Sequence, residues 1–326
     1  MQVKEDMIAH FKGDMIQLND HISFIMVDAL GREERGRGKG VDRDVYSAFW
    51  TEVYLSLFVG ELERVPFIRH DLFTAEWVAI GKIIYKGYKD VGYFPILICK
   101  SFLSFILFGE NEEEDLMKSF LNYVSNDEKT LLNEALITQD ESFFQCDEML
   151  DFLDQFKCRS LVNSTNVRTI ILELARQELV QKPHIMAVCW KESFFALQQF
   201  DAFKTKVGID ALYNQLDPSV KKVLKLFEPE TKDDADRDCL SHLKRFVKGL
   251  DQPSLKRFLR FVTGSDLVIV DHIKISFIKQ GDFERRPIAH TCGPVLEISP
   301  TYSNFVELRK EFSDVLQSSY LSMDII

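Results

Sequence analysis

The spacing of apolar residues predicts that most of this chain is helical. In residues 43–59 and 72–86, apolar side chains recur every three or four positions, the spacing that gathers them on one face of a helix. Asp42 or Asp44 is placed to cap the first of these helices, and Thr74 the second. The same spacing predicts five further helices, at 113–125, 147–157, 165–182, 191–206 and 208–227.

The C-terminal part of the chain mixes short helices with strands. Residues 267–278 are rich in valine and isoleucine and partly alternate with polar residues, a pattern typical of a strand. A second short strand is predicted at 295–298. Amphipathic helices are predicted at 239–249 and 253–262, and a final helix at about 305–318. The pattern as a whole predicts an α+β protein.

A polar stretch, residues 228–238, is the best domain boundary in the sequence. It has no apolar residue larger than alanine, and Pro229 stops the preceding helix because proline lacks the backbone donor that a helix needs. We therefore predict an N-terminal domain at 1–228, a hinge at 229–237 and a C-terminal domain at 238–326.

The glycine- and arginine-rich segment 31–41 invites comparison with a phosphate-binding loop. The spacing from Gly31 to Gly36 is right, but Arg37 and Gly38 stand where a lysine and a serine or threonine should follow. The favoured interpretation is a solvated turn between a strand at about 22–28 and the first long helix.

Composition narrows the classes of function. The net charge of −11 argues against a general affinity for nucleic acid or anionic lipid, which needs clustered lysine and arginine. The most apolar segment, 93–108, is shorter than a membrane span and is interrupted by Lys100, so we predict a buried helix there. The six cysteines include no close pair of the kind that binds metals, and a reducing compartment is the simplest inference.

Cys292 is the cysteine with candidate chemistry. It follows His290 and Thr291 on a predicted loop before the strand at 295–298, and Arg285 and Arg286 bring positive charge nearby. In an extended segment His290 and Cys292 face the same way, so the imidazole either reaches the sulfur or braces the loop through a backbone carbonyl. The structural alternative is that Cys292 is a small buried hydrophobe, as we expect for the other five cysteines.

Several segments, in order along the chain, resemble the HECT domain of ubiquitin ligases. The stretch from Gly40 to Trp50 is similar to the glycine-rich turn and helix of the larger lobe of that family. Leu259 to Ser265 resembles its Phe-x-Thr-Gly-Ser/Thr signature. His290-Thr291-Cys292 is similar to its active-site tripeptide. The segment Phe305-x-Glu307-Leu308-Arg309 is similar to its closing helix.

The resemblance implies a bilobed α+β enzyme with a large, mostly helical N-lobe and a small α+β C-lobe on a flexible hinge. Cys292 would accept ubiquitin as a thioester, with His290 and Thr291 beside it in the catalytic tripeptide. The implied partners are ubiquitin, a ubiquitin-conjugating enzyme and a protein substrate. No nucleic acid, membrane, metal or organic cofactor is implied, and the expected location is cytoplasmic, nuclear or both.

The chain also departs from the family pattern. Gly293-Pro294 follows Cys292 where phenylalanine is usual, and Met323 holds the fourth place from the end. Residues 127–200 are predicted to be helical, where the family has a β-containing subdomain that docks the conjugating enzyme. The alternatives are a catalytically weak or inactive HECT-like interaction module, and a structural α-rich protein. An active chain would be the catalytic fragment of a longer protein.

Overall fold

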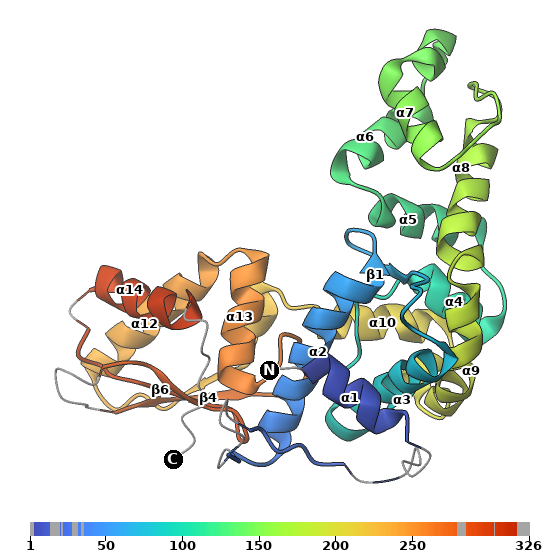
Figure 1. Ribbon diagram of the computed structural model, residues 1–326. Helices are drawn as coiled ribbons and strands as arrows, with labels where there is room; N and C mark the ends of the chain where they lie inside the picture. Colours follow the sequence, from blue (N-terminus) through green and yellow to red (C-terminus); the bar gives the residue numbers. More distant parts are fainter. Residues whose placement is uncertain are drawn as a thin grey trace.

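The computed structural model describes residues 3–13, 20, 22–27, 32–33, 36–278, 285–302 and 304–317. Their apolar side chains form two separate cores. The larger core is formed by residues between Val3 and Leu216 together with Leu267, and the smaller by residues between Val223 and Leu316. We call residues up to Leu216 the N-terminal unit and residues from Val220 onward the C-terminal unit. This mixed architecture, with a large helical unit and a small α+β unit, confirms the predicted fold class (Figure 1).

The body of the N-terminal unit is a set of helices packed around Trp190. The Trp190 ring is fully buried and stacks on Phe194 at 5.7 Å, and its Nε1 donates a hydrogen bond to the Trp77 carbonyl oxygen at 2.9 Å. The indole donor is therefore satisfied while the ring fills the core. The elements of this body are α1 (Val3–Phe11), α2 (Lys39–Leu57), β1 (Phe58–Val59), β2 (Val65–Pro66), α3 (Thr74–Val91), α4 (Lys100–Phe108), α9 (His184–Leu197), η3 (Asp201–Phe203) and α10 (Lys206–Leu216).

A helical arm projects from this body (Figure 1). It begins after α4, and a π-helical turn, η2 (Gln177–Gln181), leads back from it into α9. Residues 127–200 contain no strand, as the sequence predicts. The elements of the arm are α5 (Glu113–Tyr123), α6 (Asn126–Ala135), η1 (Glu141–Gln145), α7 (Asp147–Gln155) and α8 (Val167–Arg176).

The C-terminal unit is a four-stranded sheet with helices. The strand order is β3-β4-β6-β5; β3 and β6 run parallel to β4, and β5 runs antiparallel to β6. Buried Ile275 and Leu296 are paired residues on the two central strands. The elements are α11 (Val220–Lys225), β3 (Phe227–Pro229), α12 (Asp234–Lys248), α13 (Gln252–Thr263), β4 (Ile273–Phe277), β5 (Ile288–His290), β6 (Val295–Ile298) and α14 (Phe305–Gln317).

The two cores divide between α10 and α11, earlier than the predicted hinge at 229–237. Pro229 is paired in the C-terminal sheet, opposite Ile275 of β4. The Glu230 amide donates to the Ile275 carbonyl oxygen at 3.0 Å, and α12 begins at Asp234. The polar segment thus lies inside the C-terminal unit. The hinge concerns motion, and it stays a prediction.

Several predicted elements need correction. The helix predicted at 208–227 is two helices, because Pro218 interrupts it between α10 and α11. The strand predicted at 267–278 is confined to 273–277, and Leu267 packs into the larger core instead. Of the apolar segment 93–108, only 100–108 is helical. Within the described ranges, every helix is too short or too polar to cross a bilayer.

The predicted strand at about 22–28 is wrong where the chain is described. Residues 22–26 form no strand, and Val27 makes an isolated bridge to Glu33. The glycine-rich turn is shorter than predicted, because α2 already begins at Lys39. Gly31 of the turn lies outside the described residues.

Candidate functional site

Cys292 lies on the turn that joins β5 to β6, at residues 291–294. Its side chain is exposed, unlike those of the other cysteines. Burial raises the pKa of the Cys239 thiol to about 12, which removes that thiol from nucleophilic chemistry at neutral pH. The remaining four, all buried or packed against the larger core, are Cys99, Cys146, Cys158 and Cys189.

The turn that carries Cys292 is docked on the start of α2, in the other unit. The Cys292 thiol donates to the Arg37 carbonyl oxygen at 3.1 Å. The Arg43 guanidinium donates to the Thr291 carbonyl oxygen at 2.7 Å and lies 3.5 Å from that of Cys292. Thr291 is only 3% exposed. The candidate nucleophile is therefore held by residues about 250 positions away in the sequence, while its side chain remains open to solvent.

Two glycines make this close approach possible. A Cβ atom on Gly40 would lie 2.6 Å from the Thr291 carbonyl carbon and 2.7 Å from the Cys292 nitrogen, closer than side chains approach backbone. Gly264 ends α13 with φ +80°, the left-handed region that favours glycine, and a Cβ there would collide with the Gly40 carbonyl oxygen. The start of α2 is thus packed against both the Cys292 turn and the Thr263-Gly264-Ser265 turn.

His290 and Arg285 have partners within the C-terminal unit. His290 Nε2 lies 3.4 Å from Glu297 Oε1 on the adjacent strand, an ion pair when the imidazole is protonated. Arg285 lies 3.4 Å from Glu307 of α14 and over the Tyr302 ring. The sequence predicts that His290 reaches the sulfur or a backbone carbonyl, and it does not indicate the contact with Glu297. A catalytic role for His290, Thr291 and Cys292 stays a prediction.

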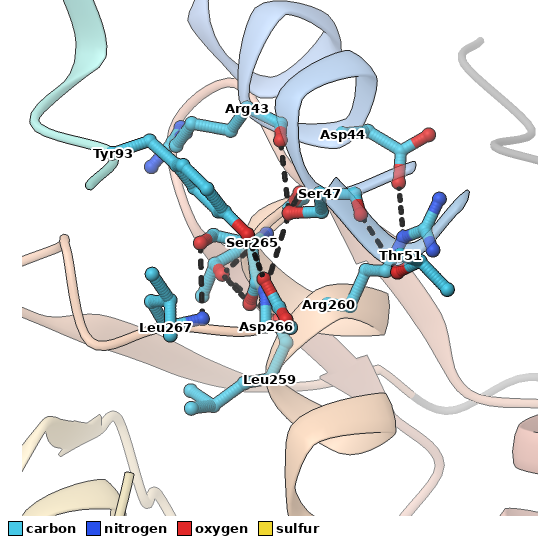
Figure 2. Close-up of polar contacts among 12 residues, drawn as sticks. Arg43, Asp44, Ser47, Thr51, Tyr93, Leu259, Arg260, Ser265, Asp266 and Leu267 are labelled. Carbon is cyan, nitrogen blue, oxygen red and sulfur yellow. Dashed lines mark hydrogen bonds and ion pairs between the residues drawn. The ribbon is translucent and has the colours of Figure 1, made fainter. Parts of the chain in front are cut away.

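A polar network joins the two units beside this turn, where α2 and α13 meet (Figures 1 and 2). Arg260 of α13 forms an ion pair with Asp44 of α2, with 2.6 Å between Nε and Oδ1. The Ser47 hydroxyl donates to the Gly264 carbonyl oxygen at 3.2 Å and accepts from the Asp266 amide at 3.4 Å. The Tyr93 hydroxyl donates to Asp266 Oδ1 at 3.0 Å. Four separate contacts therefore fix the C-terminal unit against α2 and the segment after α3.

Asp266 is a buried carboxyl group of this network whose pKa is shifted. Removal from water raises the pKa of its carboxyl group above the ordinary value, and the charges of Lys256 and Arg260 and the Tyr93 hydrogen bond only partly oppose this. Because the folded state binds this proton more tightly than the unfolded state, ionisation of Asp266 destabilises the fold. The penalty is absent below the unfolded pKa near 3.9 and grows as the pH rises through the folded-state pKa.

Asp266→Asn is therefore expected to gain stability relative to the parent as the pH is raised from about 4 to 7. The asparagine keeps an oxygen that accepts the Tyr93 hydroxyl but carries no charge. Urea unfolding of both proteins across this range measures the difference, and the subtraction removes the contribution of the other carboxylates. A variant that loses stability relative to the parent as the pH rises would contradict the assignment.

The polar residues that hold the turn were only partly visible in the sequence. The resemblance included Gly40, Arg43 and Asp44, but only as a turn and the start of a helix. Their contacts with Thr291, Cys292 and Arg260 depend on the packing of the two units, which local patterns do not encode. Among the described residues, no group of three or more histidine, cysteine or acidic side chains is placed to hold a metal ion. Met323 lies outside the described residues.

The comparison with protein families identifies the C-terminal unit. The family model of the HECT domain, a ubiquitin transferase, matches residues 201–325, from η3 through the C-terminal unit. No curated protein matches the chain. This match confirms, for residues 201–325, the recognition of a HECT-type domain from the sequence. Residues 1–200 lie outside the matched segment.

Proposed function

We propose that this chain is a ubiquitin-protein ligase that carries ubiquitin as a thioester on Cys292. The observation that carries the proposal is the position of this thiol. It is the exposed one among six cysteines, and it lies on a strand-connecting turn within the segment that matches the HECT family. The partners that the family implies are ubiquitin, a conjugating enzyme and a protein substrate. We expect the protein in the cytoplasm, the nucleus or both.

The proposed reaction is acyl transfer in two steps. The Cys292 thiolate attacks the carbonyl carbon of the thioester between ubiquitin and the conjugating enzyme; a new carbon–sulfur bond forms, and the conjugating enzyme leaves as its thiolate. A substrate lysine amine then attacks the Cys292 thioester. An amide bond forms, the amine loses a proton, and the Cys292 thiolate leaves. Covalent catalysis of this kind divides one transfer into two with lower barriers.

Cys292 must meet a donor and then an acceptor, so the C-terminal unit has to take more than one position relative to the N-terminal unit. In the present structure its turn is docked on α2. We propose this as one of the two positions. Beside the turn the contacts between the units are hydrogen bonds and one ion pair, and the hydrogen bonds can break and re-form at modest cost. Leu267 adds an apolar contact with the larger core.

A thioester assay tests the proposal. The purified chain is mixed with activating enzyme, ATP, labelled ubiquitin and a panel of conjugating enzymes, and is separated with and without thiol reductant. We expect a reductant-sensitive adduct one ubiquitin heavier that disappears completely in Cys292→Ala. Cys146→Ala is the matched control and is expected to keep the adduct. An adduct of equal yield in Cys292→Ala would refute the proposal.

The second candidate is a HECT-like interaction module that no longer transfers ubiquitin. The helical arm favours it, because residues 127–200 contain no strand of the kind expected in the family's docking subdomain. If a folded chain forms no adduct with any conjugating enzyme, this candidate replaces the first. If a charged conjugating enzyme is discharged at a rate that depends on Cys292, it is excluded.

A further inference from the structure

Arg43 connects the two units at the candidate nucleophile itself. The side chain is 6% exposed, and its Nε donates to the Lys39 carbonyl oxygen at 3.0 Å within α2. One terminal nitrogen then reaches across to the carbonyl oxygen of Thr291 at 2.7 Å, with that of Cys292 at 3.5 Å. The guanidinium is thus fixed at one edge by its own helix and holds the backbone on both sides of the Cys292 Cα atom with the other.

The chemistry of the side chain suits this task. A guanidinium is planar and presents several donors in a rigid fork, so a single arginine can bond its own helix and a second segment in one fixed geometry. Hydrogen bonds from a charged donor are stronger than neutral ones, more so when water is excluded. Here the acceptors are main-chain carbonyls, so the bonds fix the path of the turn.

The position of the Cys292 sulfur is set by the path of this turn. With the Thr291 and Cys292 carbonyls held, the thiol lies against the start of α2, where it donates to the Arg37 carbonyl oxygen. Gly38 also lies beside the thiol, since a Cβ there would be 3.5 Å from Sγ, an ordinary van der Waals distance. The thiol is restrained along one side by the backbone at 37–38 and stays open on the other.

We propose that Arg43 is a positioning residue for Cys292, which fixes the thiol against α2 by holding the carbonyls of Thr291 and Cys292. When these hydrogen bonds are lost, the turn can move away from α2. The released thiol is open to small reagents from more directions. For transfer to a lysine the effect is opposite, because a freely moving thioester spends less time in the productive geometry. This second consequence rests on the proposed function, whereas the first does not.

Arg43→Gln tests the proposal through the alkylation rate of Cys292. Glutamine keeps a polar side chain but loses the charge and the fork. The full chain is treated with iodoacetamide at fixed pH, and the labelling of each cysteine is followed by mass spectrometry. We expect Cys292 to be labelled about tenfold faster than in the parent, the scale of one hydrogen bond to a charged group. Arg43→Lys keeps the charge without the fork and should fall between the two.

Arg69→Gln is the matched control. Arg69 also donates to a carbonyl oxygen of α2, that of Ser56 at 2.9 Å, but at the far end of the helix from Cys292. The Arg69→Gln substitution should leave the labelling rate of Cys292 unchanged. Cys99 and Cys239 are buried in the two different cores and report on unfolding, so they should stay protected in every variant.

Equal labelling of Cys292 in the parent, Arg69→Gln and a folded Arg43→Gln overturns the proposal. If Arg43→Gln exposes Cys99 or Cys239, Arg43→Lys decides: a faster rate at Cys292 alone supports positioning, and the parental rate overturns it.

A second readout separates this inference from the proposed function. If the chain forms a ubiquitin thioester, Arg43→Gln should still load but discharge to a lysine acceptor about tenfold more slowly, with the half-saturating concentration of charged conjugating enzyme unchanged. If no thioester forms in the parent, the proposed function fails while the alkylation result still decides the role of Arg43.

Discussion

Gly40→Ala is expected to lower the free energy of unfolding by about 2 kcal/mol and to release the Cys292 turn from α2. The added methyl carbon would lie 2.6 Å from the Thr291 carbonyl carbon and 2.7 Å from the Cys292 nitrogen. Both are main-chain atoms and cannot rotate away, so either the turn or the helix has to move. The propensity of an isolated helix works the other way, favouring alanine over glycine by up to about 1 kcal/mol.

The sign of this effect therefore identifies its cause. A loss of stability can come only from the contact between the units, since the helix alone gains from alanine. Gly293→Ala is the matched control, because Gly293 lies in the same turn, next to Cys292, and a Cβ there has nothing within 4 Å. Chemical denaturation gives the stability, and alkylation of Cys292 should be faster in Gly40→Ala alone. A Gly40→Ala protein as stable as the parent, with Cys292 labelled at the parental rate, would show that the turn is not docked on α2 in solution.

The local pattern of the sequence predicts best those helices and strands whose bounds depend mainly on their own residues. The strand at 295–298 has the predicted bounds, and the helix predicted at about 305–318 is observed from Phe305 to Gln317, the last described residue of that segment. The amphipathic helix predicted at 253–262 begins at Gln252 because Asp251 caps it, accepting from the Ser254 amide. Periodicity and capping suffice for such elements.

The same patterns predict less well the elements whose bounds depend on packing against distant parts of the chain. Residues 267–272 have strand-like composition, but Leu267 packs into the larger core and the Val268 amide donates to the Leu216 carbonyl oxygen, so the sheet begins only at Ile273. The sequence alone does not show that a neighbour from α10 takes up this segment. Tertiary context overrides strand propensity in this way.

The candidate site shows the same division. Cys292 and its turn were found from the sequence, because the neighbouring residues form a recognisable motif. The contact of His290 with Glu297 could not be predicted, because Glu297 comes to lie diagonally across from His290 only once β5 pairs with β6 in the observed register. The sequence places Arg43 only at the start of a helix, whereas its hydrogen bond to Thr291 joins segments 248 positions apart. Candidate site residues within one segment can be predicted from the sequence, whereas contacts between distant segments can be identified only from the folded structure.

Reversal of one charge in the Asp44–Arg260 ion pair is expected to have the largest effect on the contact between the units. The pair is partly buried, with the Asp44 side chain 11% and the Arg260 side chain 24% exposed, and it joins α2 to α13. Asp44→Arg would place two guanidinium groups together in a site with limited access to water. We expect a loss of about 3 kcal/mol, the scale of removing one partner from a buried pair.

The double variant Asp44→Arg with Arg260→Asp restores an ion pair of opposite orientation, so it should regain at least half of that loss. The coupling between the two side chains is the change in unfolding free energy of the double variant minus the sum of the changes in Asp44→Arg and Arg260→Asp. Asp201→Lys is the control, since it reverses the highly exposed pair between Asp201 and Lys204, where a change within about 0.5 kcal/mol is expected.

The coupling should also appear at Cys292, because Gly264 at the end of α13 and the Cys292 turn both pack on the first turn of α2. Asp44→Arg is expected to speed alkylation of Cys292 while Cys99 stays protected, and the double variant to slow it again. If the single reversal unfolds the chain without this selective change, the ion pair stabilises the fold but does not hold the units together. If it changes neither quantity, the docked arrangement is not the one populated in solution.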